Sequence, residues 1–323
     1  MAELTLQNFL DRIRPELNGL SMEYVEGAVR DDQSLQWIPQ TFRVTPTDRL
    51  RQEYSIQERG REWPEAGELD PYPTRELDKP VDLLFSLREW KDSFTVSDLW
   101  LMGGQYSDLH MYMRFREQVE ELLAGGLRAY ARRAGTIWLG LWTGALQQCL
   151  DGENFFSANH VHGTGTVVYS NLLDEPLSLA ALQHALELPC AVDMVDQWNN
   201  PIFLRFDTLY HGPALSITAD TIINNVVLPG GTNSERNIVG SRISRRVEIP
   251  WMVDSQFPGA SHWWAVGAST QHSLLGKVFQ QPHLRPILDS GQDQVQVRGR
   301  ALFEFYFKTW EGLIGSTGGA GSV

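Results

Sequence analysis

The residues most able to do chemistry lie in one stretch, where Cys149 and Asp151 precede the pair His160 and His162. Cysteine, aspartate and histidine are the side chains that bind zinc in proteins. Two histidines separated by one residue in a strand point to opposite faces, which makes joint ligation difficult. The chain has no second Cys/His pair at zinc spacing. The sequence therefore predicts no metal site.

Motifs of nucleophilic and nucleotide-dependent enzymes are incomplete. Gly259–Trp263 lacks the second glycine of a nucleophile elbow. Gly267–Val278 has the wrong spacing for a phosphate-binding loop, and no Ser or Thr follows Lys277. Gly163–Gly165 lacks the third glycine of a dinucleotide-binding turn. We therefore expect no catalytic residues, no cofactor-binding residues and no cofactor.

Carboxylates leave one enzymatic alternative open. Two acidic side chains suffice for glycoside hydrolysis, and the chain has 40 acidic residues. Its 11 tryptophans could stack on sugar rings, although tryptophans more often pack in cores and interfaces. A soluble carbohydrate-active enzyme is therefore an alternative that the sequence favours less than a non-catalytic protein.

The net charge of the chain limits the kinds of partner that it can bind. Over 323 residues the formal net charge is -13, whereas a surface that grips nucleic acid needs clustered Lys and Arg. This balance suits a surface that lies near DNA without holding it, and it equally suits plain solubility. The densest basic patch, Arg236–Arg246, could face a neighbouring subunit, contact DNA or be solvated.

The N-terminal residues and the apolar runs do not predict export or membrane insertion. Met1–Thr5 has neither the basic nor the apolar region of a signal peptide. The longest nearly apolar run, Ile137–Leu146, is far shorter than the roughly 20 residues of a membrane span. Cys149 and Cys190 lie in apolar helical patterns, which is typical of reduced core residues of a cytoplasmic product. We expect no membrane partner.

The first hundred residues have the pattern of two extended segments. Residues 1–50 lack a dense apolar core, yet Trp37 and Phe42 are too apolar for a free tail, so we expect an arm held by a partner. In residues 51–100, strands at Tyr54–Ile56 and Val81–Phe85 flank a stretch rich in proline. An isolated two-stranded arm is marginal in water, so this hairpin needs a surface to lie on.

Helical periodicity dominates the middle of the chain. Apolar residues at three-four spacing predict a long helix over Ser107–Arg133, with a bend at Gly125-Gly126 and a break at Gly135. A second helix is expected from Leu179 to Leu188, with Ser178 as its N-cap and Pro189 as its stop.

Alternation of period two marks the C-terminal part. Apolar side chains alternate with polar ones from Val295 to Phe307, which predicts a strand longer than usual. Glycines dominate the residues that follow, so we expect a flexible tail over 315–323.

Three blocks of residues follow one another in a characteristic order. The first is Asp151–His160, with Tyr169–Leu172 and Leu177-Ser178 behind it. The second is Asn199–Ile202 with Leu209–Leu215, and the third is Val247–Trp251 with His262–Ala265. In order and spacing these blocks resemble the major head subunits of tailed phages of the Mu-like type. The resemblance covers roughly residues 63–268.

This resemblance implies an α+β fold of the Hong Kong 97 type, with an N-terminal arm, an extended β loop, a long spine helix, and peripheral and axial domains. The ranges it suggests are 1–50 for the arm, 51–100 for the extended loop, 101–211 for the peripheral domain, 212–288 for the axial domain, 289–314 for a long peripheral strand and 315–323 for the tail. The implied function is a capsid protein that assembles into an icosahedral shell enclosing phage DNA.

The resemblance also implies partners and a location. The expected partners are other copies of the chain in pentamers and hexamers, a portal, a scaffold or maturation protease, decoration proteins and non-specifically packaged double-stranded DNA. The expected location is the virion, after assembly in the bacterial cytoplasm. One alternative has the same fold, namely an encapsulin-like shell around a cargo enzyme.

Overall fold

The computed structural model describes residues 32–56, 81–97, 108–144, 147–149, 151–161, 168–191, 204–224, 238–269, 272–289 and 294–319, with a few positions between 17 and 27. The fold is mixed α+β, as expected. Two compact units share the chain. Unit 1 comprises residues 1–50, 86–136 and 275–305, and unit 2 comprises residues 51–85, 137–274 and 306–323.

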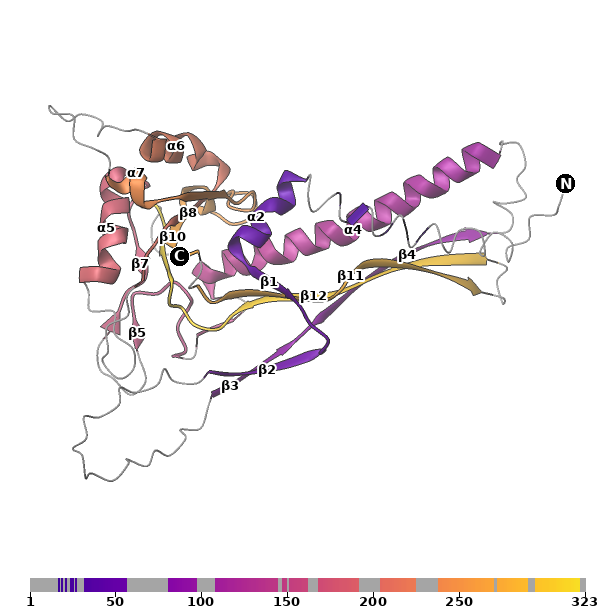
Figure 1. Ribbon diagram of the computed structural model, residues 1–323, viewed down its shortest axis with the longest axis horizontal. Coiled ribbons are helices and arrows are strands. Elements are labelled where there is room, and N and C mark those ends of the chain that lie inside the picture. Colours follow the sequence, from indigo (N-terminus) through magenta and orange to yellow (C-terminus); the bar gives the residue numbers. More distant parts are fainter. Residues whose placement is uncertain are drawn as a thin grey trace, which may run out of the picture. The chain divides into compact units, whose positions relative to one another are not determined.

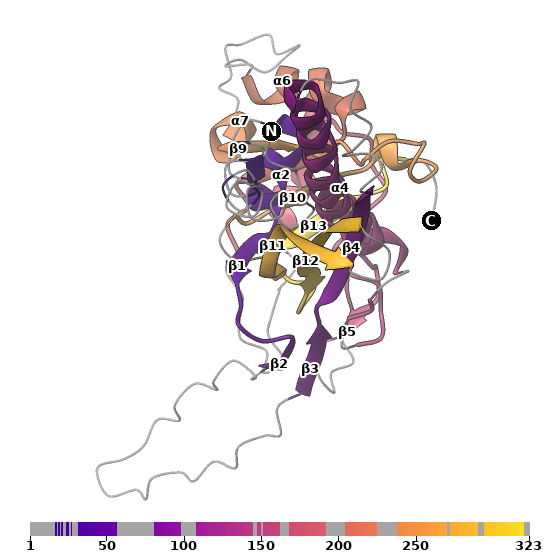
Figure 2. The same cartoon turned by 90° about the vertical axis from the view of Figure 1, so that its right-hand side faces the viewer.

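Unit 1 is built on a four-stranded sheet. Its strands are β1 (Arg43–Pro46), β4 (Arg88–Ser97), β11 (Leu274–Asp289) and β12 (Gln294–Phe307), in the order β1-β11-β12-β4. Strand β1 runs parallel to β11, and β12 runs antiparallel to β4. Helix α2 (Gln33–Thr41) precedes β1, and the long helix α4 (Asp108–Thr143) lies along one face of β4, β11 and β12 (Figures 1 and 2).

The core of unit 1 lies between α4 and this sheet. Apolar residues at helical spacing in α4 meet the inward alternate residues of the strands. The buried cluster consists of Leu17, Val96, Phe115, Val119, Leu123, Leu284, Val295 and Val297. The helix predicted from three-four spacing and the strand predicted from period-two alternation are therefore confirmed, and each turns its apolar side to the other.

Helix α4 is longer than the sequence indicates. It runs for 36 residues from Asp108 to Thr143, so the predicted break at Gly135 is wrong. A glycine costs a helix about 1 kcal/mol relative to alanine. Burial on both sides of Gly135 outweighs that cost. The buried neighbours are Ala134, Ile137, Trp138, Leu141 and Trp142. The bend expected at Gly125-Gly126 stays a prediction.

Two glycines allow α4 and the sheet to approach closely. A Cβ on Gly126 would lie 3.1 Å from the Cβ of Pro282 in β11. A Cβ on Gly299 in β12 would lie 3.2 Å from Cγ of Leu122 in α4. Both separations are tighter than ordinary van der Waals contact, so the absence of side chains at these positions sets the distance between helix and strands.

Strand β11 was not predicted. All but the last of its 16 residues fall within the range 212–288 that the sequence suggested for the axial domain, whereas residues 275–289 lie in unit 1. Pro282 and Pro286 argue against a central strand because proline cannot donate to a ladder. However, β1 pairs with only Leu275–Val278, which leaves the rest of that edge of β11 open in the described sheet. Prolines are tolerated on such an edge.

A buried ion network ties α4 to two strands of unit 1. The carboxylate of Glu304 in β12 lies 2.6 Å from Nε of Arg133 in α4 and 2.9 Å from Nε of Arg88 in β4. The Phe305 backbone N–H also donates to Glu304, at 2.9 Å. The side chains of Glu304 and Arg133 are only 7% and 10% exposed.

Unit 2 is built on a five-stranded sheet in the order β7-β13-β10-β8-β9. Its strands are β7 (Leu172–Leu173), β8 (Thr208–His211), β9 (Arg245–Glu248), β10 (Trp264–Gly267) and β13 (Leu313–Ser316). Its helices are α5 (Leu179–Ala191), α6 (Ser216–Asn224), α7 (Ile238–Arg242) and the short turns η1 (Pro213–Leu215) and η2 (Ala260–His262). Strands β5 (His160–Val161) and β6 (Val168–Tyr169) form a separate pair.

Helix α5 begins as predicted and ends later. The Ser178 hydroxyl accepts the Ala181 N–H at 3.1 Å, which confirms the N-cap. The helix continues through Pro189 to Ala191, so the predicted stop before Pro189 is wrong. A proline in the last turn removes only one backbone donor, and the buried Ala181, Leu182, Ala185 and Leu186 hold the helix in place. The side chain of Cys190 lies outside the described residues.

The extended segments are described in part. Strands β2 (Arg51–Ile56) and β3 (Val81–Ser86) form a two-stranded sheet, which confirms both predicted strands. Residues 57–80 between them lie outside the described residues. Residues 88–97, which the sequence placed in the loop, form β4 of the unit 1 sheet. Gly315 and Ser316, placed in the tail, lie in β13, paired with Ala265 and Trp264 of β10.

None of the described helices combines the length and the apolar character of a membrane span.

Replacing Glu304 with glutamine should lower the free energy of unfolding by about 3 kcal/mol, because it leaves the buried Arg133 without a counter-charge. Chemical denaturation of the purified chain measures this loss. The matched control is Glu120→Gln, which breaks the exposed pair between Arg116 and Glu120 and should cost at most about 0.5 kcal/mol. Equal, small losses in both variants would contradict the role given to Glu304.

Candidate functional site

The first sequence block forms a tight turn after α4. The Cys149 N–H donates to Glu153 O at 2.8 Å, and the Gly152 N–H donates to Cys149 O at 3.0 Å. The Asp151 carboxylate accepts the Glu153 N–H at 3.1 Å. Gly152 has φ of +83°, a backbone conformation that glycine adopts readily. The acidic-glycine start of the motif therefore encodes this turn.

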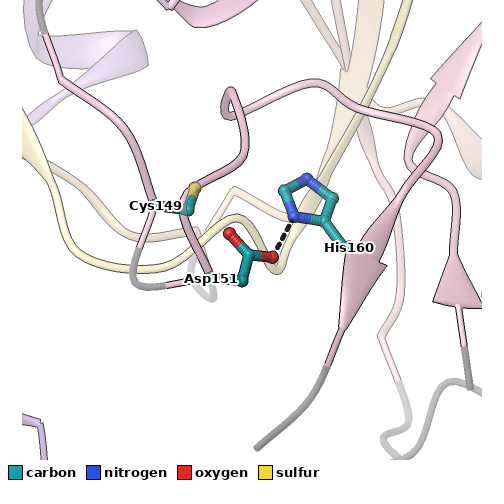
Figure 3. A group of neighbouring side chains, drawn as sticks. All are labelled: Cys149, Asp151 and His160. Atoms are coloured by element: carbon teal, nitrogen blue, oxygen red, sulfur yellow. Dashed lines mark hydrogen bonds and ion pairs between the residues drawn. The ribbon is translucent and has the colours of Figure 1, made fainter. Parts of the chain in front are cut away.

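The turn brings together three of the residues singled out by their chemistry, Cys149, Asp151 and His160 (Figure 3). One ligand atom from each lies within 4.8 Å of the others. His160 is fully buried, with Nδ1 2.6 Å from Oδ2 of Asp151 and Nε2 3.0 Å from O of Phe155. Both ring nitrogens thus already have oxygen partners. His162 lies outside the described residues.

This geometry fits a hydrogen-bonded pair better than a metal centre. Zinc holds nitrogen and oxygen ligands at about 2.0 to 2.2 Å, so a 2.6 Å separation between Nδ1 and Oδ2 leaves no room for an ion between them. Burial raises the pKa of the Cys149 thiol, and the charges of Asp151 and Glu153 raise it further. A thiol binds metal as the thiolate, which these surroundings disfavour.

A neighbouring ring and an amide complete the surroundings of His160. The ring of Trp310 stacks on His160 with centroids 4.4 Å apart and planes 9° apart. Buried Asn171 donates to Phe155 O at 2.8 Å and accepts the Ser157 N–H at 2.9 Å. The Gly315 N–H in turn donates to Asn171 O at 2.9 Å. The motif residues therefore fasten the turn to the C-terminal strand of unit 2.

The two phenylalanines of the motif belong to an aromatic core. Phe156 packs on Trp142 with centroids 4.4 Å apart, and Trp142 stacks on Trp263 at 5.0 Å. Phe155 meets Phe307 edge-on at 4.9 Å. A Cβ on Gly315 would lie 2.8 Å from the Phe156 ring, so glycine is needed there. The tryptophans in this group are packed in a core, which agrees with the interpretation favoured from the sequence.

The second block encodes a change from strand to helix. Strand β8 ends at His211, and η1 begins at Pro213, the first turn leading into α6. A Cβ on Gly212 would lie 2.4 Å from Met252 O, so only glycine fits. His211 is fully buried with Nδ1 2.8 Å from Gly212 O, and burial lowers the pKa of its ring. Residues 199–202 lie outside the described residues.

The third block supplies two further strands of the same sheet. Its first part ends β9, which runs parallel to β8, and its second part leads into β10, which is antiparallel to β8. Trp264 in β10 is fully buried, and its indole N–H donates to Glu175 O at 2.9 Å. All described parts of the three blocks therefore lie in unit 2 and build its sheet and core.

Sequence reasoning missed Asp207, which organises one end of that sheet. Its carboxylate accepts the Ser269 N–H at 2.9 Å and the Ser269 hydroxyl at 2.7 Å, and its carbonyl accepts the Arg245 N–H at 3.0 Å. Burial opposes ionisation, but the Ser269 and Thr208 hydrogen bonds and the Arg245 charge hold the pKa of Asp207 below its usual value. No sequence motif marks this aspartate, because its partners are up to 62 residues away.

The arginine patch lies partly at the edge of the unit 2 sheet. Arg242 ends α7, and the exposed Arg245 and Arg246 begin edge strand β9. Arg246 forms an ion pair with Asp220 of α6. Arg236 lies outside the described residues. The described part of the patch is therefore partly neutralised within the subunit.

Replacing His160 with alanine should lower the free energy of unfolding by about 2 to 4 kcal/mol, because the change removes a packed ring and the imidazole partner of Asp151. Denaturant unfolding measures this effect. His184→Ala is the matched control, since His184 and Glu175 form an exposed pair worth at most about 1 kcal/mol. Stoichiometric zinc in the purified wild type, lost from the His160 variant, would contradict the hydrogen-bonded description.

No family model matches this sequence, and no curated protein matches it. Several solved structures match this chain in fold. A phage-related protein of Bordetella bronchiseptica matches with a TM-score of 0.51 and 12% identity, over 95% of this chain and 97% of that chain. The mature capsid of bacteriophage PhiM1 matches with a TM-score of 0.49 and 9% identity, over 84% of each chain.

A virus-like particle from Pyrococcus furiosus matches with a TM-score of 0.44 and 12% identity, over 94% of this chain and 98% of that chain. The identities are too low to show more than architecture. In the first match the likeness extends along almost the whole of both chains. The α+β arrangement of this chain is the Hong Kong 97-type fold.

Proposed function

We propose that this chain is the major capsid protein of a tailed phage or prophage, which assembles into an icosahedral shell around double-stranded DNA. The observation that carries the proposal is the fold, because 95% of the chain matches a phage-related protein from end to end. The three sequence blocks support it, since their described residues form the joints and the core of one unit. The likeness to a phage capsid and to a virus-like particle points in the same direction.

The described units support an assignment of the parts of the shell subunit. Unit 1, with α4 on its four-stranded sheet, corresponds to the peripheral domain, and α4 is its spine helix. The five-stranded sheet of unit 2 belongs to the axial domain. Strands β2 and β3 form the base of the extended loop, and residues 1–50 include the N-terminal arm. We propose these assignments in place of the ranges expected from sequence where the two differ.

The proposed mechanism is association, and it assigns no catalytic, cofactor or metal role to any residue that the structure describes. Copies meet in rings of five and six, and repeated interfaces close the shell. Each interface adds a small free energy that is multiplied by the number of copies. The proposed partners are the chain itself, a portal, a scaffold or maturation protease, decoration proteins and packaged DNA held without sequence preference. The proposed location is the virion, after assembly in the host cytoplasm.

Deleting Glu65–Lys79, with a short Gly-Ser bridge in its place, should separate folding from assembly. Wild type should sediment as pentamers, hexamers or closed shells. The deletion variant should stay soluble and unfold cooperatively but form no closed particle, because about 1 to 2 kcal/mol lost per contact is repeated across the shell. Sedimentation velocity and thermal unfolding measure the two properties.

The control for the deletion is removal of residues 320–323, which should leave sedimentation unchanged. Intact shells from the Glu65–Lys79 deletion would show that this segment is not the extended loop. Unfolding of the deletion variant would place the segment in the core. A wild type that remains monomeric at high concentration, whatever the salt, would refute the capsid proposal. Particles that enclose an enzyme would favour the encapsulin-like alternative.

A further inference from the structure

The two faces of the unit 1 sheet differ in chemistry. On β12, Val295 and Val297 are buried beneath α4, whereas the alternate residues Arg298 and Arg300 are exposed. Cross-strand partners share a face, and Arg298 lies opposite Ser93 while Arg300 lies opposite Lys91. The face turned away from α4 is therefore polar and can be reached by another molecule.

This polar face is cationic, although the chain as a whole is acidic. Its exposed cations are Lys91, Arg285, Arg298 and Arg300, and they line a groove of about 950 Å³ together with His283. The carboxylate of Glu89 lies among these cations. Asp92 also borders the groove, but its cross-strand partner Gly299 faces α4, so Asp92 lies on the other side of the sheet. We call the four cations, His283 and Glu89 the cationic face. Positive charge is concentrated here on a chain of net charge -13.

Part of this charge is not neutralised within the subunit. Glu89 lies between two cations, 2.7 Å from Nζ of Lys91 and 2.5 Å from Nε of Arg300. Nε of Arg298 donates to the neutral Gln296 side chain at 2.7 Å. Among the described residues, no carboxylate pairs with Arg285 or Arg298. These two guanidinium groups are therefore available to an anionic partner.

A shell subunit of charge -13 must contact copies that carry the same charge. Like net charges repel, so stable contacts need patches of opposite sign that face each other. The sequence contains a complementary segment, Glu65–Lys79. Its carboxylates are Glu65, Glu68, Asp70, Glu76 and Asp78, and its cations are Arg75 and Lys79.

We infer that the cationic face receives the acidic segment Glu65–Lys79 of a second copy of the chain. This inference rests on the proposed shell function and adds the surface that the extended loop contacts. The signs match, since the segment has five carboxylates against two cations and can supply the anionic partners that Arg285 and Arg298 lack among the described residues. DNA is the other anionic molecule that this face could bind, and it forms a separate outcome of the test.

Charge exchange in the full-length chain tests this pairing. The face variant is Arg285→Glu with Arg298→Glu, which breaks no described ion pair, and the segment variant is Glu65→Arg with Glu68→Arg. Each variant alone should lose the rapidly sedimenting particles that wild type forms. The variant that combines all four substitutions should recover them, because opposite charges again face each other at the exchanged positions.

The control is Arg128→Glu with Arg132→Glu, which makes the same charge change on exposed positions of α4 and should leave assembly intact. Thermal unfolding of each variant checks folding, and Arg285→Gln with Arg298→Gln serves if the reversed charges destabilise unit 1. Unchanged particles from the face variant, or no recovery in the combined variant, would overturn the pairing. Loss of assembly in the control as well would assign the effect to net charge and would also overturn it.

A DNA-binding measurement tests whether DNA, and not the segment Glu65–Lys79, occupies the cationic face. Binding of a linear duplex is compared between wild type and the face variant by electrophoretic mobility shift. We expect no more than a twofold change. A tenfold loss of DNA binding with normal particles would make DNA the occupant and overturn the inference while leaving the shell function intact. A wild type without particles would instead refute the shell function itself.

Discussion

The structure of unit 1 depends on the close packing of one long helix on a sheet. Gly126 in α4 and Gly299 in β12 remove the side chains that would hold the two layers apart. Within that closed space Glu304 is surrounded by Arg133 and Arg88, so the contact between helix and strands has a fixed register as well as an apolar core. A buried charge network of this kind opposes any sliding of α4 along the sheet, because sliding would leave a buried charge without its counter-charge. In the proposed shell, this contact would help each subunit to keep one shape.

The elements with strong periodicity could be predicted from the sequence. Three-four spacing identified α4, and period-two alternation identified β12, because each has one face against the core. Their limits could not be predicted, since tertiary burial carries α4 through Gly135. Strand β11 escaped prediction because its prolines argue against a strand, and only the open edge beside β1 explains why they are tolerated. Such an edge is a property of the sheet and leaves no local signal.

The stretch with the residue types best suited to chemistry, Cys149 to His160, forms a hydrogen-bonded turn in the described part of the chain. Its residue types were recognised correctly as a group, since Cys149, Asp151 and His160 do meet. What the sequence could not show is that Phe155 O and Asp151 occupy both nitrogens of His160, or that Trp310 covers the ring. Asp207 was missed for the converse reason, because its role arises only when the strands it joins are assembled. The three blocks were informative because they specify packing at fixed glycines and aromatics.

The central claim is that this fold builds a closed shell from copies of itself. Electron cryomicroscopy of the purified full-length chain tests it most directly, because it gives particle symmetry and the traced subunit in one reconstruction. The account predicts an icosahedral shell of five- and six-membered rings, whose subunits show α4 packed on β11 and β12. Images that contain only isolated monomers, or particles in which this subunit fold is absent, would contradict it.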